Sequence, residues 1–327
     1  MDHPISKVDV VVVGAGPVGL ACGLVLQRKG LSVLILEKGA LVNSLVGYPT
    51  NMEFFSTPDL LEIGNYPLVS SYYKPHREEV IDYYRRVAQA EGLSIELGAL
   101  VVGLSGNSGA FEVALPSRKV SCNYVVVATG FFDQPNRLGV PGESLSKVSH
   151  YFKEPFAFAR QHVAVIGAKN SAAKAALQCH RYGAHVTMIV RGPEIGPTVK
   201  YWIRPDLINR IAEGSIGAHF EAQVTSIAEK TLSFSTPGGQ KTIQNDVVLA
   251  LIGYHPDYSL LTALGIETQN DSVQTPVYNE DTFETNRKGV FLAGTVCGGR
   301  HTSRWFIENG RFHAQVIASS IAKNFRK

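Results

Sequence analysis

The sequence predicts an α/β protein with two Rossmann-like nucleotide-binding domains, each a three-layer ββα arrangement, the second inserted into the first. Two glycine turns, at Gly14–Gly19 and Gly167–Ala172, each follow a run of buried-strand type and precede a helical pattern. A further strand pattern, Gly289–Ala293, appears late in the chain and leads into a final helical pattern. One βαβ unit used twice, with a late return strand, indicates an inserted domain and not a repeat array.

The opening of the chain reads as strand, turn, helix and strand. Val8–Val13 is a β-branched run typical of a buried parallel strand, and Leu20–Lys29 has helical periodicity. Leu31–Leu36 predicts the next strand, which ends at Glu37. Within Gly14–Gly19, the first glycine permits the tight turn, the second lets a diphosphate approach the backbone, and the third lets helix pack on strand.

The second unit repeats this order with a degraded turn. Val163–Ile166 predicts a strand, Ser171–Tyr182 a helix and His185–Val190 the following strand. Lys169 and Ala172 stand where glycines usually stand. The flanking strand and helix therefore favour a nucleotide site here more than the glycine content does.

The remaining segments complete both domains. Tyr72–Gly92 predicts a helix, Leu93–Leu115 several short strands, and Tyr124–Thr129 another buried strand. The last helix is expected at Thr302–Ala322. We place the domain crossings so that residues 1–153 and 257–327 form the first domain and residues 154–256 form the inserted domain.

The composition is that of a globular protein in water. Of 327 residues, 45% are hydrophobic and 18% are charged, which excludes a disordered chain. The net charge of +3 gives no reason to expect nucleic acid, and no apolar run has the ~20 residues that a bilayer span needs. Cys22, Cys122, Cys179 and Cys297 form no CxxC pair and no metal-ligand spacing, so we expect a reducing cytoplasm and no metal.

The residue that ends the second strand differs in charge between the two units, and this predicts two different nucleotides. Glu37 offers a carboxylate to ribose hydroxyls, which suits FAD or NAD and not NADP. Arg191 offers a guanidinium that can hold a 2′-phosphate bidentately, and Lys200 and Arg204 follow it. We therefore expect NADPH in the second domain, with NADH or a vestigial fold without nucleotide as the alternatives.

Several motifs resemble those of known flavoproteins. The inserted second domain and the run Val125–Gly130 are similar to the thioredoxin reductase-like flavoproteins. A closer likeness, over essentially the whole chain, is to the YpdA-type bacillithiol-disulfide reductases. That likeness is carried by Tyr48–Thr57, Val148–Phe152, Gly253–Asp257 and Phe306–His313. The resemblance implies FAD, NADPH and reduction of a low-molecular-weight disulfide through the flavin.

Three departures from the family pattern concern the chemistry. The family's proposed redox cysteine lies in the first fingerprint, at the position that Val18 holds here, and the thioredoxin reductase CxxC is absent. In the wider superfamily the last strand ends in Gly-Asp, whereas here it ends in Gly294 and Thr295. A threonine hydroxyl can still make one neutral hydrogen bond to the ribityl chain, so flavin binding is still expected, while the electron acceptor stays open.

The expected cofactor contacts come from both fingerprints and from later loops. For FAD they are Gly14, Gly16, Pro17, Val18, Gly19, Glu37, Lys38, Thr50, Asn51, Thr129, Gly130, Gly294, Thr295, Thr302 and Phe306. For NADPH they are Gly167, Lys169, Asn170, Ser171, Arg191 and Lys200. Thr50 and Asn51 are candidates for flavin hydrogen bonds, and backbone N–H groups near Thr302–Phe306 for stabilising the reduced flavin.

Cys297 is the candidate catalytic residue. It lies in the turn before the expected last helix, where a thiol can have a depressed pKa and can replace the missing fingerprint cysteine. The alternative is a small side chain that packs near the ribityl chain.

Other functions stay open beside disulfide reduction. Electron transfer of the ferredoxin–NADP reductase type needs no cysteine, which suits Val18. A flavin monooxygenase is disfavoured, because Ser144 and Ser146 stand at the Phe and Gly positions of the F-x-G-x-x-x-H linker that would end at His150. A redox sensor without catalysis would bind the flavin but not react with NADPH. For the enzyme we expect a small disulfide or small redox protein as partner, and a homodimer or homotetramer.

Overall fold

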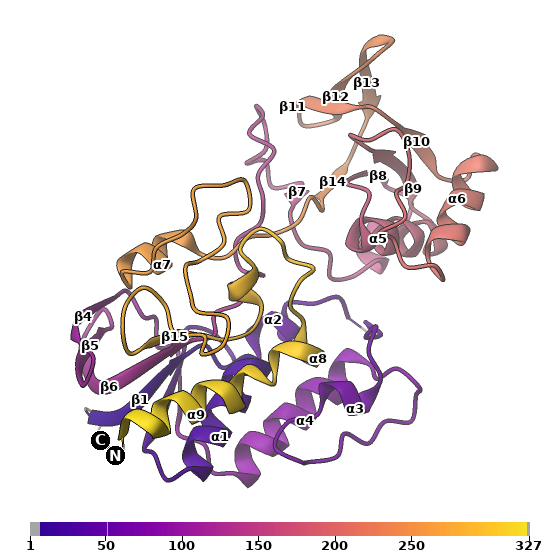
Figure 1. The fold of residues 1–327 in the computed structure, drawn as a ribbon. Coiled ribbons are helices and arrows are strands. Elements are labelled where there is room, and N and C mark those ends of the chain that lie inside the picture. Colours follow the sequence, from indigo (N-terminus) through magenta and orange to yellow (C-terminus); the bar gives the residue numbers. More distant parts are fainter. Residues whose placement is uncertain (1–6, 51, 326–327) are drawn as a thin grey trace. The chain divides into compact units, whose positions relative to one another are not determined.

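The computed structural model describes residues 7–50 and 52–325 of the chain. Within these residues the chain divides into two compact units, which Figure 1 shows in its sequence colours. The first unit comprises residues 7–47, 52–134 and 254–325, and the second comprises residues 48–50 and 135–253. Each unit contains its own mainly parallel sheet, so the prediction of two Rossmann-like units is confirmed.

The first unit is built on one seven-stranded sheet with the order β3-β2-β1-β6-β5-β4, and β15 also pairs with β6. The long strand β6 pairs in parallel with β1 and β15 and in antiparallel with β5, so the antiparallel strands continue the parallel part. The strands are β1 (Lys7–Val13), β2 (Val33–Glu37), β3 (Ile95–Leu97), β4 (Gly103–Asn107), β5 (Ala110–Ala114), β6 (Lys119–Val127) and β15 (Val290–Leu292).

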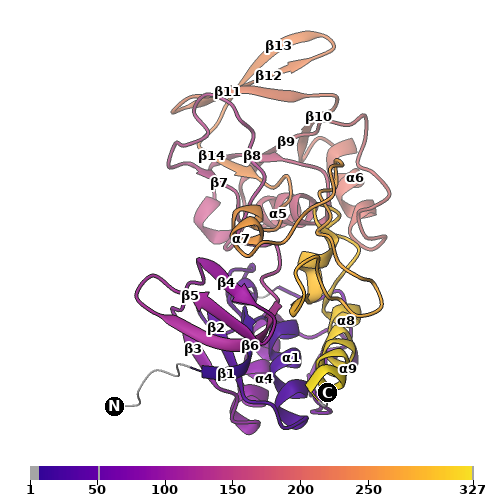
Figure 2. The ribbon, with the colours of Figure 1, turned by 60° about the vertical axis from the view of Figure 1, so that its left-hand side comes forward.

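Helices α1, α4 and α9 lie side by side in both views of the first unit (Figures 1 and 2). The helices of this unit are α1 (Pro17–Arg28), α2 (Asn43–Val46), α3 (Pro58–Leu61), α4 (Arg77–Ala90), α7 (Tyr258–Ala263), α8 (Ile307–Gly310), α9 (His313–Phe325) and the 3-10 turn η2 (Gly294–Gly298). Helix α1 is buried from Pro17 to Leu26, as expected for the helix that follows the first fingerprint. None of the described helices combines the length and the apolar content that crossing a bilayer would require.

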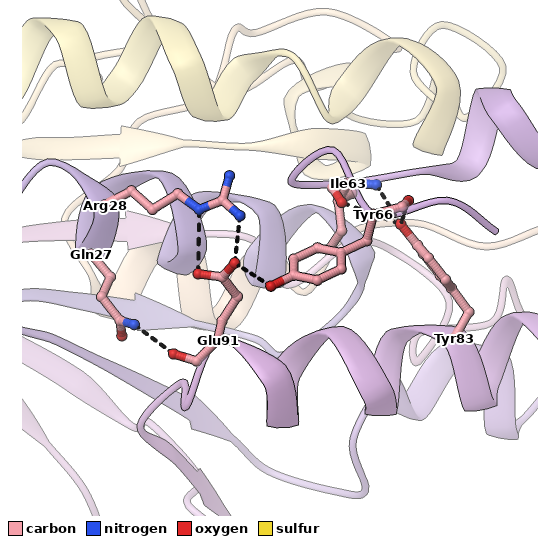
Figure 3. Close-up of polar contacts among 6 residues, drawn as sticks. All are labelled: Gln27, Arg28, Ile63, Tyr66, Tyr83 and Glu91. Carbon is pink, nitrogen blue, oxygen red and sulfur yellow. Dashed lines mark hydrogen bonds and ion pairs between the residues drawn. The ribbon is translucent and has the colours of Figure 1, made fainter.

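The C-terminal end of α1 is fastened to α4 by polar contacts (Figure 3). Arg28 forms an ion pair with Glu91, which follows α4, and Tyr66 donates its hydroxyl to the same carboxylate at 2.8 Å. Gln27 Nε2 donates to the backbone oxygen of Glu91 at 2.7 Å, and the Tyr83 hydroxyl donates to the backbone oxygen of Tyr66 at 2.9 Å. These contacts fix the far end of the helix whose N-terminus carries the first fingerprint.

The second unit has a five-stranded parallel sheet with the order β10-β9-β8-β14-β7 and a separate three-stranded antiparallel sheet, β11-β12-β13. Its strands are β7 (Val148–Ser149), β8 (His162–Ile166), β9 (His185–Ile189), β10 (Gly217–His219), β11 (Gln223–Ile227), β12 (Thr231–Thr236), β13 (Gly239–Gln244) and β14 (Val247–Ala250). Its helices are η1 (Phe156–Phe158), α5 (Asn170–Arg181) and α6 (Arg204–Ala212).

Alternate residues of β8 show the layers of the second unit. Val163 and Val165 belong to the apolar cluster that contains the buried face of α5. Ala164 and Ile166 belong to a different cluster, with Phe234 of the three-stranded sheet. Because successive side chains of a strand point to opposite faces, the sheet is covered by helices on one side and by strands on the other.

Two predicted helices begin later than the sequence pattern indicated. Helix α4 starts at Arg77 and not near Tyr72, because Pro75 disfavours helical backbone before it and Glu79 accepts the N–H of His76 at 2.8 Å.

The expected helix Thr302–Ala322 is wrong at its start and is interrupted. Asn309 accepts the N–H of Phe306 at 2.8 Å and donates to the backbone oxygen of Arg304 at 3.1 Å, so the helical backbone begins only at Ile307. The short helix α8 ends at Gly310 and a new helix, α9, starts at His313.

Candidate functional site

The carboxyl ends of β1, β2 and β6 meet at a pocket in the first unit. The central strand β1 pairs with β2 on one side and with β6 on the other, so this edge is the switch point at which open α/β sheets bind ligands. The pocket is lined by Val13, Gly14, Leu36, Glu37, Lys38, Ala99, Leu100, Val101, Thr129, Gly130, Phe131, Asp133, Gln134, Asp257 and Leu260. Five of the residues predicted to hold FAD are therefore brought together here.

The three glycines of the first fingerprint have different roles in the fold. A Cβ atom on Gly14 would lie 2.7 Å from the Ala128 oxygen, and Gly14 has a φ of 105°, which disfavours any side chain. A Cβ atom on Gly19 would lie 1.9 Å from the Gly14 oxygen. A Cβ atom on Gly16 would meet no heavy atom within 4 Å. The protein itself therefore requires Gly14 and Gly19, whereas the space beside Gly16 is left for something else.

Glu37 is oriented by two backbone N–H groups. Its side chain is buried, its Oε2 accepts from the N–H of Ala15 at 2.8 Å, and its Oε1 accepts from the N–H of Gly39 at 2.8 Å. An ionised carboxylate oxygen can accept more than one hydrogen bond, so both oxygens keep capacity for a ribose hydroxyl. The carboxylate is thus held at the pocket wall as the sequence predicted for a nucleotide with a free 2′-hydroxyl.

Two acidic residues of the pocket, Asp133 and Asp257, were not among the predicted cofactor contacts. Lys38 Nζ lies 2.8 Å from the carboxylate of Asp133, and Gln134 Nε2 lies 3.3 Å from the carboxylate of Asp257. Asp257 also caps α7, because it accepts the N–H of Leu260 at 3.1 Å. Asp133 lies in a loop without a motif, whereas Asp257 lies in the stretch that carried the family resemblance.

The end of β15 lies against the first fingerprint. A Cβ atom on Gly294 would lie 3.1 Å from the Val18 side chain, and one on Gly310 would lie 3.2 Å from the Gly294 Cα. A Cβ atom on Gly130 would lie 3.3 Å from the Thr295 hydroxyl oxygen. The predicted FAD residues Val18, Gly130, Gly294 and Thr295 therefore form one close-packed group.

The structure contradicts the expected chemistry of Cys297. Its thiol is buried and lies 3.9 Å from Nδ1 of His313, and burial raises its pKa far above the ordinary value. The expectation of a depressed pKa is wrong because Cys297 lies inside a short buried 3-10 turn, where desolvation of the thiolate outweighs any favourable backbone dipole. The alternative, a small packed side chain, fits this environment.

The other cysteines are no better placed as nucleophiles. Cys22, Cys122 and Cys179 are buried, and burial raises the pKa of each thiol to about 12. All cysteines of the chain are thus buried thiols with raised pKa values.

The structure shows the local surroundings of three further residues predicted to contact the flavin, which are Thr50, Thr302 and Phe306. Thr50 belongs to the second unit, where its N–H donates to the Lys153 oxygen at 2.9 Å. Asn51 lies outside the described residues. Thr302 lies in a turn and not in a helix, and the N–H of Phe306 is already donated to Asn309.

The first glycine of the second fingerprint has no room for a side chain, like Gly14 of the first. Gly167 has a φ of 126°, and a Cβ atom there would lie 2.5 Å from the Leu251 oxygen. Ala172 stands where the third glycine is usual, and a Cβ atom on Gly167 would lie 3.3 Å from its methyl group, so the glycine at 167 leaves room for the alanine. Lys169 precedes α5 with an exposed side chain, and Ser171 in the first turn of α5 is also exposed.

Asn170 connects this turn to the basic loop that follows β9. Its Nδ2 donates to the Thr198 oxygen at 3.2 Å, and its Oδ1 accepts from the N–H of Lys200 at 2.9 Å. Both ends of the amide are therefore engaged with protein, which places the backbone of Lys200 beside the start of α5. Arg191 follows β9 with an exposed side chain.

Known proteins are similar to this chain over nearly its full length. Residues 11–294 match the family described as pyridine nucleotide-disulphide oxidoreductase. The bacilliredoxin reductase Bdr of Bacillus subtilis is 39% identical over 317 residues, covering 96% of this chain and 97% of that protein. The solved bacillithiol disulfide reductase Bdr (YpdA) of Staphylococcus aureus is 38% identical, with a TM-score of 0.94 over 98% of this chain and 99% of the other.

A more distant relative has a different activity in its name. The ferredoxin–NADP reductase of Ignicoccus hospitalis is 27% identical over 300 residues, covering 88% of this chain and 90% of that protein. The extent of the family match and the identity to the Bacillus protein decide the classification, and the resemblance predicted from the motifs is confirmed. The chain belongs to the pyridine nucleotide-disulphide oxidoreductase family and is an oxidoreductase.

Proposed function

We propose that this chain is an NADPH-dependent FAD oxidoreductase that reduces a low-molecular-weight disulfide of the bacillithiol-disulfide type through the flavin. Thioredoxin reductase-like and Bdr-type members of the family depend on FAD and NADPH. The observation that carries the proposal is the presence of two glycine-turn cradles of the same design, one next to a buried carboxylate and one next to an exposed guanidinium.

The first cradle fits FAD. The unfilled space beside Gly16 lets a diphosphate approach the N-terminus of α1, where backbone N–H groups favour negative charge. Glu37 would hold the adenosine ribose, and Gly294 with Thr295 would lie along the ribityl chain, the threonine donating one neutral hydrogen bond. FAD bound there would supply two-electron transfer.

The second cradle fits NADPH. Lys169 and the exposed N-terminus of α5 would bind the diphosphate, with Ser171 in the first turn of the helix. Arg191, just after the second strand, would hold the 2′-phosphate. Lys200, whose backbone Asn170 holds beside the start of α5, would add positive charge near the diphosphate. A guanidinium in this place favours NADPH over NADH.

The substrate class follows from the relatives. One is named for reducing a bacilliredoxin and another for reducing bacillithiol disulfide, so a small disulfide or a small redox protein is the natural acceptor. The balanced reaction is NADPH + H⁺ + RSSR → NADP⁺ + 2 RSH. The disulfide bond breaks, and each sulfur leaves with a proton.

The burial of the four cysteines favours a second function, electron transfer to a small redox protein. All four are buried and their pKa values are raised, and Val18 stands where the family has its proposed redox cysteine. Transfer of electrons to ferredoxin or flavodoxin needs no thiol, and a ferredoxin–NADP reductase is among the relatives. We therefore keep this electron transfer as the competing function.

An anaerobic experiment separates the two. Purified protein loaded with FAD is mixed with NADPH, and the loss of flavin absorbance is followed. Bacillithiol disulfide, a bacilliredoxin in its bacillithiolated form, ferredoxin, flavodoxin, quinones and oxygen are then added separately. Return of colour with the disulfides supports the proposal, return with ferredoxin or flavodoxin alone supports the rival, and failure of NADPH to bleach the flavin contradicts both.

A further inference from the structure

His313 is a buried histidine in the first unit with one well-defined hydrogen bond. It is 2% exposed and lies at the start of α9. Its Nδ1 accepts the backbone N–H of Gly294 at 3.1 Å. Because Nδ1 accepts this bond, its proton must be absent, and the neutral ring carries its hydrogen on Nε2.

Three neighbours hold the imidazole in place. The Phe283 ring stacks on it with centroids 3.9 Å apart, and the Trp305 ring meets it edge-on with centroids 4.4 Å apart. The sulfur of Cys297 lies 3.9 Å from the same Nδ1. The ring therefore has an aromatic surface on two sides and a neutral thiol beside its acceptor atom.

Phe283, whose ring stacks on His313, has an unusual backbone conformation. Its φ of 60° lies in the left-handed region, which phenylalanine rarely occupies. Hydrogen bonds hold it there, because its N–H donates to the Asn279 oxygen at 2.7 Å and its oxygen accepts from the N–H of Leu292 in β15 at 2.9 Å. A strained residue that persists in a well-bonded turn is a recognised sign of a functional constraint.

The hydrogen bond to His313 secures the turn at the end of β15. The preceding residue, Ala293, still donates to Val127 of β6 at 2.9 Å, but Gly294 turns away with a φ of 78° and has left the ladder. Its buried N–H then needs another acceptor, and His313 supplies it. Gly294 in turn packs against Val18 at the N-terminus of α1.

We propose that His313 is a positioning residue of the flavin site, whose neutral imidazole fixes the Gly294–Thr295 turn against the first fingerprint through the Gly294 N–H. The inference rests on the proposed function, since it takes Gly294 and Thr295 as the residues along the ribityl chain. It assigns to His313 no contact with FAD or substrate.

Two amides test the acceptor. In His313→Asn the side-chain oxygen can take the place of Nδ1, whereas in His313→Gln the longer side chain puts its amide near the position of Nε2 and leaves Gly294 without its partner. FAD affinity is measured by titrating FAD-free protein, and the flavin midpoint potential by equilibration with a reference dye. We expect His313→Gln to weaken FAD binding about tenfold and to shift the potential, and His313→Asn to stay within about threefold of the parent.

A measurement on FAD-free protein keeps this test separate from the proposed function. Nitrogen chemical shifts of His313 should show a proton on Nε2 and none on Nδ1. If the parent protein binds no FAD, the proposed function fails while this tautomer can still be checked. A proton on Nδ1, equal losses in both variants, or unchanged FAD binding and potential in His313→Gln would each overturn the role of His313.

Discussion

Replacing Gly16 with alanine tests whether the first cradle is shaped by a ligand. The added methyl group would meet no protein atom within 4 Å, and the backbone at Gly16, with φ −70° and ψ 175°, is open to any residue. If the space beside Gly16 receives a diphosphate, the methyl group will occupy part of it. The variant should then fold normally and lose FAD.

The opposing contributions to stability nearly cancel. Glycine is preferred to alanine where α1 begins, which costs the variant up to about 1 kcal/mol. The alanine reduces the freedom of the unfolded chain, which contributes about 0.4–1 kcal/mol in the other direction.

The effect on FAD binding is larger. Displacing the diphosphate from two backbone N–H groups, at about 1.5–3 kcal/mol for each hydrogen bond to a charged group, removes roughly 3–6 kcal/mol of binding free energy. FAD affinity should therefore fall by a factor of roughly 10² to 10⁴.

The assay is urea unfolding of FAD-free protein together with titration of FAD by fluorescence. Gly103→Ala is the matched control, since its Cβ would have only an ordinary contact of 4.0 Å with Ala114 in an edge region of the sheet. Gly19→Ala should fail to fold, because its Cβ would lie 1.9 Å from the Gly14 oxygen. Normal FAD affinity in Gly16→Ala would refute the assignment of this cradle to a diphosphate.

Three further results are expected. Arg191→Ala should raise the KM for NADPH roughly 10- to 100-fold and leave the KM for NADH unchanged. Arg181→Ala is the control. Equal effects on the KM for both nucleotides would contradict the assignment of Arg191 to the 2′-phosphate. Glu91→Gln should lower the free energy of unfolding, measured in urea, by about 1 kcal/mol, because Arg28 and Tyr66 both lose a charged acceptor. An unchanged free energy of unfolding would mean that solvent screens the partly exposed Arg28–Glu91 pair. Burial lowers the pKa of His313 to about 4 from 6.5, so the unfolded state takes up a proton first as the pH falls, and about 2 kcal/mol of stability should be lost between pH 7 and pH 5. Among the described residues, the titratable side chain recorded within hydrogen-bonding distance of His313 is the neutral thiol of Cys297. His313→Asn should therefore abolish this share of the pH dependence. An identical pH profile in the variant would disprove the assignment to His313.

The parts of the site that follow from local sequence were predicted well. The turn at Gly14–Gly19 lies between strand and helix as expected, because glycines with these steric demands have few alternatives. Glu37 lies at the end of β2, because a run of five buried residues can end only where the sheet ends. Arg191 lies just past β9, where the apolar run that ends at Val190 gives way to an exposed loop. These positions are fixed by the chain immediately around them.

The parts that depend on tertiary contacts were not predicted. The segment Ala99–Val101 lines the pocket only because β3 adds to the edge of the sheet beside β2. The start of the last helix was placed too early, because the side chain of Asn309 caps the backbone at Phe306, and no periodicity reports a cap of this kind. His313 was read as part of a motif, but its bond to Gly294 joins residues from a strand end and a helix start.

The cysteines set the condition that any disulfide chemistry must satisfy. Burial raises the pKa of the Cys22, Cys122 and Cys179 thiols to about 12 and raises the pKa of Cys297 as well, so burial favours the neutral thiol in all four. Since the thiolate is the attacking species in disulfide exchange, the chain holds no ready nucleophile for a disulfide. Disulfide turnover that survives in the variant Cys22→Ala, Cys122→Ala, Cys179→Ala, Cys297→Ala would mean that the flavin reduces the acceptor without an intervening protein thiol. Turnover that is lost would require one of these thiols to become accessible during the reaction; if that thiol is Cys297, its contact with His313 would have to open.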